Sequence, residues 1–97
     1  MSAEVEELLK RFQAYKNIAG IIVVDNDGIP IKTTLDNTQT VHYAALMQNF
    51  VLKARQVVLD LDATNELTLL RMRTLTNEVI LATSDNFYLI VIQKPSD

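Results

Sequence analysis

Residues 23–32 read VVDNDGIPIK, and the interpretation of this stretch decides the fold. Its Asp-Asn-Asp-Gly segment can be a calcium loop, a phosphate-binding loop or a turn between two strands. A calcium loop with Gly28 at its sixth position would need oxygen ligands from Val23 and Thr34, and neither carries a carboxylate. A phosphate-binding loop would need a following Gly-Lys-Ser/Thr, which the stretch does not contain. The stretch therefore predicts a β-hairpin, in which Gly28 supplies the positive φ of a tight turn.

The hydrophobic pattern on both sides of this hairpin predicts two helices and five strands. An amphipathic helix is expected over residues 3–16, with Ser2 as its cap. A long helix is expected over about 38–61, with capping oxygens from Asp36-Asn37-Thr38. The five strands are expected over residues 21–24, 29–35, 66–73, 78–83 and 87–93. The connectors between the last three strands are short enough for hairpins.

Three residues determine the expected order of the sheet. Pro30 cannot donate a hydrogen bond to a ladder, so the second strand belongs at an edge. Arg71 and Arg73 alternate along the third strand, which makes that strand the candidate for the other edge. The first and fifth strands are apolar on both faces and belong in the middle. The chain therefore predicts one α/β (α+β) domain over residues 1–97, of topology α-β-β-α-β-β-β. Its five-stranded antiparallel sheet has the order 2-1-5-4-3 and lies between helices on both sides.

Composition excludes several classes of protein. The chain has 97 residues, a net charge of -3 and no basic stripe, which argues against a nucleic-acid partner. It has no cysteine, so disulfides and thiolate metal sites are excluded. The apolar run Leu89–Ile92 is too short to span a membrane, and the N-terminus does not resemble a signal peptide. We expect a cytoplasmic protein without a membrane partner.

The residues that could carry chemistry do not form a recognisable catalytic set. His42, the single histidine, falls on a polar stripe of the long helix and is expected to be solvated. Asp60 and Asp62 are either an acid pair or a solvated helix end, and the latter is favoured. Lys53 and Arg55 are interpreted as charges on a helix face rather than phosphate ligands. We therefore expect no catalytic site, no cofactor and no metal.

The long helix has more apolar surface than one sheet needs. At about 100° per residue, nine residues share one wide face that can pack on the sheet: Tyr43, Leu46, Met47, Phe50, Val51, Ala54, Val57, Val58 and Leu61. A second line, Ala45, Leu52 and Leu59, repeats every seventh residue on a different side. This line is either part of a deeply buried helix or a contact with another chain. The second interpretation is favoured, because 48% of so short a chain is hydrophobic.

The third strand also indicates self-association. A twofold axis at this edge would let the strand pair with its own copy and would bring the two long helices together. We therefore expect a homodimer. Its contacts are expected on the helix residues Ala45, Leu52 and Leu59 and on the strand residues Leu67, Leu69, Arg71 and Arg73.

Four segments together resemble the roadblock family of dynein light chains: VVDNDGIPIKTT, YAALMQNFVLKAR, ELTLLRMR and FYLIVIQKP. The resemblance implies a roadblock (longin/profilin-like) three-layer α/β/α fold. It also implies a non-catalytic, homodimeric light chain that binds the dynein intermediate chain and supports motor assembly, cargo linkage and microtubule-based transport. The alternative assembly is a heterodimer with a sister light chain. The implied location is the cytoplasm and the cytoskeleton, with the cilium or axoneme as an alternative.

The sequence departs from the dynein members in two hairpins. It has Leu75-Thr76 where they tend to have basic residues, and Ala82-Thr83-Ser84 where they tend to have Ala-Pro-Asp. The alternative implied by similar domains is a scaffold or regulator of a small GTPase. Nucleotide-dependent binding would distinguish this role from that of a dynein light chain.

A partner surface is expected on one face of the sheet. Roadblock-like domains often end in a third helix beside the first, whereas this sequence stops at Asp97, directly after its last strand. Part of a sheet face is therefore expected to be open to an amphipathic helix of a partner, and a dimer would hold two such partners. The residues expected at this surface are Leu69, Val5, Leu9 and Phe12.

Overall fold

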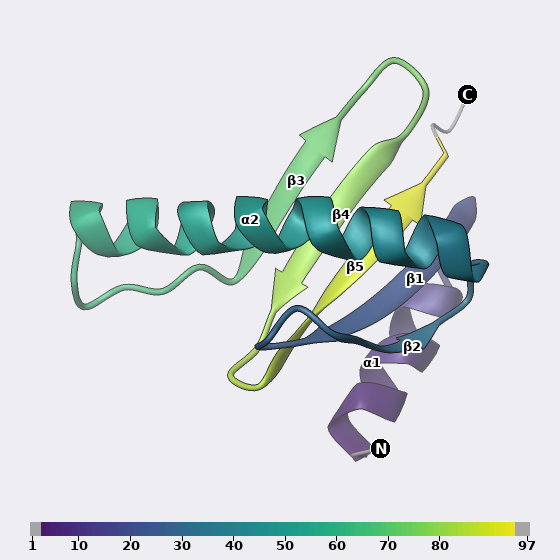
Figure 1. Cartoon of the computed structure of the whole chain (residues 1–97), viewed down its shortest axis with the longest axis horizontal. Coiled ribbons are helices and arrows are strands. Elements are labelled where there is room, and N and C mark those ends of the chain that lie inside the picture. The colour runs from purple at the N-terminus through teal and green to yellow at the C-terminus, as the bar shows by residue number, and fades with distance from the viewer. Residues whose placement is uncertain (1–2, 95–97) are drawn as a thin grey trace.

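The computed structural model describes residues 3–94 and contains two helices and five strands within them. Figure 1 shows a sheet with α1 on one side and α2 crossing the other. The elements are α1 (Ala3–Gln13), β1 (Ile18–Asp25), β2 (Pro30–Thr33), α2 (Asn37–Leu61), β3 (Leu69–Arg73), β4 (Glu78–Thr83) and β5 (Phe87–Gln93). The predicted cap of the first helix, Ser2, lies outside the described residues. No helix in this part of the chain combines the length and hydropathy needed to cross a membrane.

The sheet has the order β2-β1-β5-β4-β3, and all neighbouring strands are antiparallel. The predicted topology and strand order are therefore confirmed. Pro30 lies opposite Val24 on the edge strand β2, where its missing N–H breaks no central ladder. The strand β3 forms the opposite edge and pairs only with β4.

The first helix is shorter than predicted, and the first strand is longer. The helix α1 ends at Gln13 instead of residue 16, and Asn17 turns the chain with a φ of 65°. Asparagine tolerates this left-handed conformation better than most residues. The strand β1 begins at Ile18, because Lys94 N donates a hydrogen bond of 2.8 Å to Asn17 O and extends the pairing with β5.

The turn that decides the fold is the predicted hairpin between β1 and β2. Asp25 Oδ1 accepts hydrogen bonds from Asp27 N at 2.9 Å and from Ile29 N at 3.0 Å. Gly28 N donates to Asp25 O at 3.0 Å, and Gly28 has a φ of 85°. The Asp25 carboxylate thus binds backbone N–H groups of its own turn, which is the usual structural role of aspartate in tight turns.

Two hydrophobic clusters lie on opposite faces of the sheet. The cluster beneath α1 consists of Val5, Leu9, Phe12, Ile21, Val23, Ile80, Phe87, Leu89 and Val91. The cluster beneath α2 consists of Ile22, Val24, Ala44, Val51, Val79, Leu81, Tyr88, Ile90 and Ile92. The prediction that Val5, Leu9 and Phe12 contact a partner is corrected by this arrangement. These side chains are the apolar face of α1 and are buried against its own sheet.

The predicted wide apolar face of α2 is only partly buried. Asp36 caps this helix by accepting a hydrogen bond of 2.8 Å from Gln39 N. Among the helix residues, only Thr40, Ala44 and Val51 are fully buried. The prediction was wrong for four members of the wide face, which are exposed: Leu46, Phe50, Val57 and Leu61.

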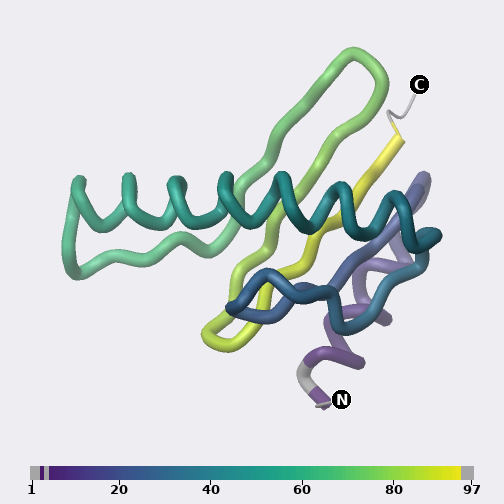
Figure 2. Tube along the Cα trace, viewed as in Figure 1, coloured from purple at the N-terminus to yellow at the C-terminus, as the bar shows by residue number. Residues whose placement is uncertain are grey.

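For Val57 and Leu61 the physical reason is the length of α2, whereas Leu46 and Phe50 are exposed because they point about 100–160° away from the buried Ala44 and Val51. Its 25 residues span about 37 Å, whereas five strands span about 19 Å between the axes of the outer two. Figures 1 and 2 show the C-terminal part of the helix reaching past β3, the edge strand, with nothing beneath it except the connecting segment that returns to β3.

Candidate functional site

The residues that could carry chemistry lie apart on the surface. His42 and Asp60 are exposed on α2. Asp62 follows the helix and accepts hydrogen bonds from Thr64 Oγ1 at 2.7 Å and from Thr64 N at 3.0 Å, which lower the pKa of its carboxyl group. Residues 3–94 contain no group of three or more His, Asp or Glu side chains arranged to hold a metal ion. The candidate sites described below are surfaces of α2 and β3.

The outer sides of α2 form the first surface. The predicted line is exposed: Ala45, Leu52 and Leu59 all face solvent, and 51% of the Leu52 side chain is accessible. The exposed residues Leu46, Phe50, Val57 and Leu61 form a second line on the other side of the buried stripe, about 120–180° from Leu52 in the helical projection. The helical periodicity of the sequence predicts this second line in the core. For Val57 and Leu61, exposure could have been found by comparing the length of the helix with the width of the sheet.

The second surface is the side of β3 that faces away from α2. Arg71 lies opposite Ile80, a member of the cluster beneath α1, so Leu69, Arg71 and Arg73 point to the α1 side of the sheet. Half of the Leu69 side chain is accessible, and Arg71 and Arg73 are 61% and 70% accessible. This face is therefore open at the edge where the sequence predicts a partner, and Leu69 lies on it.

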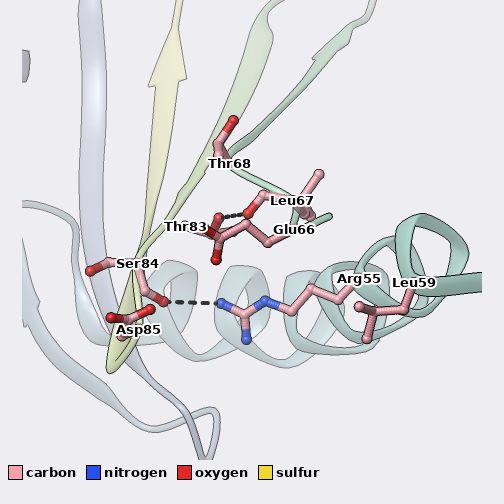
Figure 3. Close-up of a pocket in the computed structure, with 8 residues that line it drawn as sticks. All are labelled: Arg55, Leu59, Glu66, Leu67, Thr68, Thr83, Ser84 and Asp85. Atoms are coloured by element: carbon pink, nitrogen blue, oxygen red, sulfur yellow. Dashed lines mark hydrogen bonds between the residues drawn. The ribbon is translucent and has the colours of Figure 1, made fainter. Parts of the chain in front are cut away.

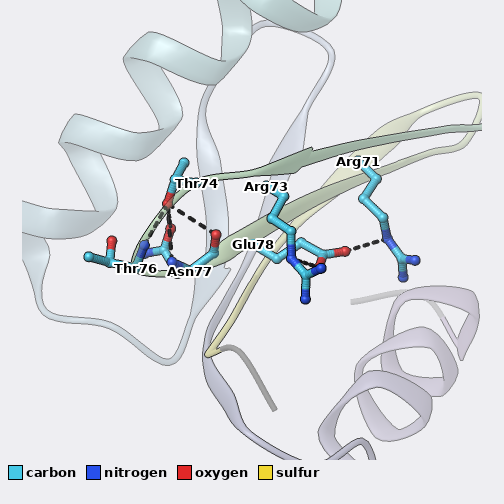
Figure 4. Close-up of polar contacts among 6 residues, drawn as sticks. All are labelled: Arg71, Arg73, Thr74, Thr76, Asn77 and Glu78. Carbon is cyan, nitrogen blue, oxygen red and sulfur yellow. Dashed lines mark hydrogen bonds and ion pairs between the residues drawn. The ribbon is translucent and has the colours of Figure 1, made fainter. Parts of the chain in front are cut away.

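One carboxylate forms ion pairs with both arginines of this face, as Figure 4 shows. Arg71 Nε lies 2.6 Å from Glu78 Oε1, and Arg73 Nε lies 3.6 Å from Glu78 Oε2. The Glu78 side chain is only 15% accessible, so the two guanidinium groups cover it. The three residues leave one net positive charge on a chain whose total charge is -3.

A cleft of about 340 Å³ lies between α2, the segment that precedes β3 and the β4–β5 turn (Figure 3). The Arg55 side chain crosses this cleft, and its Nη2 donates a hydrogen bond of 3.4 Å to Ser84 O. On the opposite wall, Thr83 Oγ1 donates to Leu67 O and fixes the segment that leads into β3. Arg55, which the sequence analysis treated as a helix-face charge, instead joins α2 to the β4–β5 turn.

Hydrogen bonds also connect α2 to both turns at the same end of the sheet. The Tyr88 hydroxyl donates to Gln48 Oε1 at 2.9 Å, and Gln48 Nε2 donates to Asn26 O at 3.4 Å. Asn26 Nδ2 donates to Asp85 O at 3.0 Å. Burial raises the pKa of Tyr88 to about 12, against an opposing effect of the Arg55 charge. The phenol therefore stays protonated and able to donate at neutral pH. These contacts hold α2 at a fixed position over the sheet.

Comparisons with known proteins identify the family and the fold. A family model described as the Roadblock/LC7 domain matches residues 4–94. A Roadblock/LC7 domain from Streptomyces avermitilis superposes with a TM-score of 0.79 at 15% identity, over 89% of this chain and 73% of that chain. MglB from Myxococcus xanthus superposes with a TM-score of 0.74 at 19% identity, over 95% of this chain and 76% of that chain. A structure described as MglB with a tetrameric arrangement gives a TM-score of 0.76 at 9% identity, over 97% and 75%. These solved structures share the fold with this chain.

Proposed function

The chain belongs to the Roadblock/LC7 family, and from this premise we propose that it is a non-catalytic, homodimeric scaffold that holds a partner protein. The observation that carries the proposal is the part of α2 that extends past β3. A second copy joined at β3 would continue the sheet beneath this part of the helix. The exposed leucines of α2 would then be covered, and the open backbone groups of β3 would be paired.

The size of the exposed apolar surface supports a second copy as the occupant. Six large hydrophobic side chains of α2 are between 38% and 56% accessible, and Leu61 is 82% accessible. They are Val41, Leu46, Phe50, Leu52, Val57 and Leu59. These residues belong to two exposed lines on different sides of α2, and exposed apolar surface of this extent on one helix is typical of an interface. The structure described as a tetrameric arrangement of MglB supports assembly of this fold from several copies.

The partner protein is assigned to the α1 side of β3 and β4. Leu69 offers an apolar contact there, and Arg71 and Arg73 offer charge. An amphipathic helix that carries acidic residues beside its apolar stripe fits this surface. Two copies would present two such surfaces and would hold their partners by avidity.

A small GTPase, or a complex that works with one, is the partner that we favour. This is the alternative role that the resemblance implies, and the solved structures that share the fold include a Roadblock/LC7 domain from Streptomyces avermitilis and MglB from Myxococcus xanthus. The two hairpins that depart from the dynein pattern, at Leu75-Thr76 and at Ala82-Thr83-Ser84, support the same choice. A dynein light chain that binds the intermediate chain is the second candidate, supported by the four segments that resemble that family. Either role is proposed to take place in the cytoplasm, the second one on microtubules.

The first test of this proposal is the mass of the wild-type chain in solution, measured together with calorimetric titrations of two partners. We expect the mass of a dimer. A small GTPase that binds only when loaded with GDP, or only with a GTP analogue, would support the scaffold of a nucleotide switch. Binding of a dynein intermediate-chain segment, at two segments per dimer and without nucleotide dependence, would support the second candidate instead.

A pair of variants then tests the assigned surface. Leu69→Asp is expected to abolish binding of whichever partner is found and to leave the chain soluble and dimeric. Leu75→Asp is the matched control, because Leu75 is fully exposed at the tip of the β3–β4 hairpin, away from the open face. Unchanged partner binding by Leu69→Asp would refute the assignment of this face.

A further inference from the structure

The guanidinium group of Arg55 lies half-buried in the cleft beside the β4–β5 turn and has no carboxylate partner there. Its hydrogen bond to Ser84 O, at 3.4 Å, is longer than the usual range of about 2.7–3.2 Å. A guanidinium group has five N–H donors, so most of the donors of Arg55 are left over. Among the described residues, this group makes no ion pair. Partial burial of a cation without a counter-charge is unfavourable, which makes Arg55 a candidate binding group for a ligand.

Two carboxylates lie on different sides of this guanidinium group, as Figure 3 shows. Glu66 belongs to the segment before β3, and Asp85 belongs to the β4–β5 turn. Both residues are exposed, and within the described part of the chain neither side chain forms a hydrogen bond or an ion pair. A simple anion would be attracted by Arg55 and repelled by the carboxylates, and a simple cation would meet the opposite forces. The cleft therefore suits a ligand that carries both charges at separate places.

Two leucines give the same cleft an apolar part. Leu59 is 44% accessible, and Leu67 is half-buried, so both can lose further accessible surface to a ligand. Figure 3 shows Leu59 at the end of the cleft away from Asp85. The volume of about 340 Å³ lies at the lower end of the range for small-molecule sites, which is about 300–1,000 Å³. A small ligand with one aliphatic group is therefore the best match in size.

We infer that this cleft binds a free α-amino acid with an aliphatic side chain. The carboxylate of the amino acid accepts the free N–H groups of Arg55 in the two-bond geometry that guanidinium groups favour. The ammonium group pairs with Glu66, because Asp85 lies at the other end of the cleft from the leucines. The aliphatic side chain contacts Leu59 and Leu67. This inference goes beyond the proposed function, since it concerns a small molecule and the residues of a single copy.

An NMR titration of the isotope-labelled full chain with L-leucine tests the inference, because weak binding to a small protein shifts individual amide signals. We expect saturable shifts at residues 66–68, at residues 83–85 and at the Nε–H signal of Arg55. A ligand of this size in an open cleft is expected to have a dissociation constant on the order of 1 mM. The absence of saturable shifts at about fiftyfold this concentration would overturn the inference, and so would shifts confined to another part of the chain.

Analogues of leucine test each contact on the wild-type chain, where no variant can fail to fold. Leucinamide lacks the carboxylate, N-acetylleucine lacks the ammonium group, and glycine lacks the aliphatic side chain. Each is expected to bind at least about tenfold more weakly than leucine, because one charged or apolar contact is lost. Equal affinities for leucine and leucinamide would overturn the role of Arg55. Tighter binding of the peptide Leu-Gly-Gly would overturn the assignment to a free amino acid, because it would identify a peptide N-terminus as the occupant.

A matched pair of variants then tests the residue that carries the inference. Arg55→Met keeps the aliphatic part of the side chain and is expected to weaken leucine binding at least about tenfold. Lys53→Met removes a cation from an exposed position of α2 outside the cleft, and it is expected to bind leucine as wild type does. Glu66→Gln, in an exposed segment, is expected to weaken binding at least about threefold and provides a second variant if Arg55→Met does not fold.

Equal leucine binding by Arg55→Met and wild type would overturn the inference. The same result for Glu66→Gln would overturn the assigned position of the ammonium group. The outcome is independent of the proposed function: a monomeric wild-type chain that binds leucine in this way would refute the proposed dimer and support the cleft. A dimer that holds its partner protein but does not bind leucine would do the reverse.

Discussion

Arg71 Nε lies 2.6 Å from one oxygen of Glu78, and Arg73 Nε lies 3.6 Å from the other, so a single carboxylate pairs with two arginines at the edge of the sheet. This arrangement lets a strand with two cations approach its own copy. It also leaves a local positive charge on the face assigned to a partner, although the chain as a whole is acidic.

Glu78→Gln is expected to weaken the dimer. The substitution removes the charge that both arginines share and leaves four unneutralised guanidinium groups near the twofold axis. We expect the dissociation constant of the dimer to rise about two- to fivefold at low salt, and the effect to shrink at high salt because the repulsion is screened. Sedimentation equilibrium at two ionic strengths measures both. Glu7→Gln, on the exposed side of α1, is the matched control, and an equal effect of both variants would contradict the assigned role of Glu78.

Leu52→Glu is expected to prevent dimer formation. Half of this side chain is already exposed, so each copy loses about 1 kcal/mol of apolar burial and must also bury a charge. Two copies together raise the dissociation constant at least about thirtyfold. Lys53→Glu is the control on the neighbouring exposed position. If Leu52→Glu stays dimeric while Phe50→Glu becomes monomeric, the helix contact lies on the second exposed line of α2.

Gly28→Ala is expected to destabilise the fold by about 1–2 kcal/mol. Gly28 has a φ of 85°, and an added Cβ would lie 3.0 Å from Gln48 Cδ and Cγ. The substitution therefore strains the turn and presses on the side chain that links α2 to Tyr88. Urea denaturation measures the change. Asp27→Ala in the same turn is the control and is expected to change the stability by less than about 0.5 kcal/mol, because its side chain is exposed. Equal stability of Gly28→Ala and wild type would show that the turn relaxes.

Tyr88→Phe is expected to lower the free energy of unfolding by about 1 kcal/mol at pH 8, since Gln48 loses its hydrogen-bond donor. The pKa of Tyr88 is raised by burial to about 12, whereas an unfolded tyrosine has a pKa of about 10. The protonated phenol is thus favoured by folding. Its stabilising effect is complete below pH 10 and is lost as the pH rises from 10 to 12.

The pH dependence of Tyr88→Phe separates this effect from general alkaline unfolding. Wild type and variant share every other ionisable group, so the difference in unfolding free energy between them reports Tyr88 alone. We expect this difference to decrease from pH 9 to pH 11.5. A constant difference over that interval would mean that the phenol has an ordinary pKa in the folded chain.

The sequence predicted the strand order because the edges of a sheet have local chemical requirements. Proline lacks the N–H that a central strand must donate, and alternating arginines cannot be buried on a central strand. Pro30, Arg71 and Arg73 each indicate an edge strand by their residue type alone. The hairpin at Gly28 was predictable for the same reason, since the turn depends on its own residues.

The partner surface was predicted less well, because exposure depends on neighbours that the sequence does not specify. Leu69 lies on an open face as expected. Val5, Leu9 and Phe12 were assigned to the same surface, but an amphipathic helix buries its apolar face on the nearest sheet. The cleft beside Arg55 was missed, because it forms between segments far apart in the chain.

By itself, the sequence determined the type and order of the elements, the two edges of the sheet and the turn at Gly28. These properties follow from backbone donors, side-chain periodicity and permitted dihedral angles, which act within a few residues. The tertiary structure alone decided which apolar residues of α2 are buried and which remain exposed. It also decided that Glu78 is shared by two arginines and that Tyr88, Gln48 and Asn26 connect the helix to the turns. The reason is that burial and charge pairing depend on the width of the sheet beneath the helix and on the register of neighbouring strands.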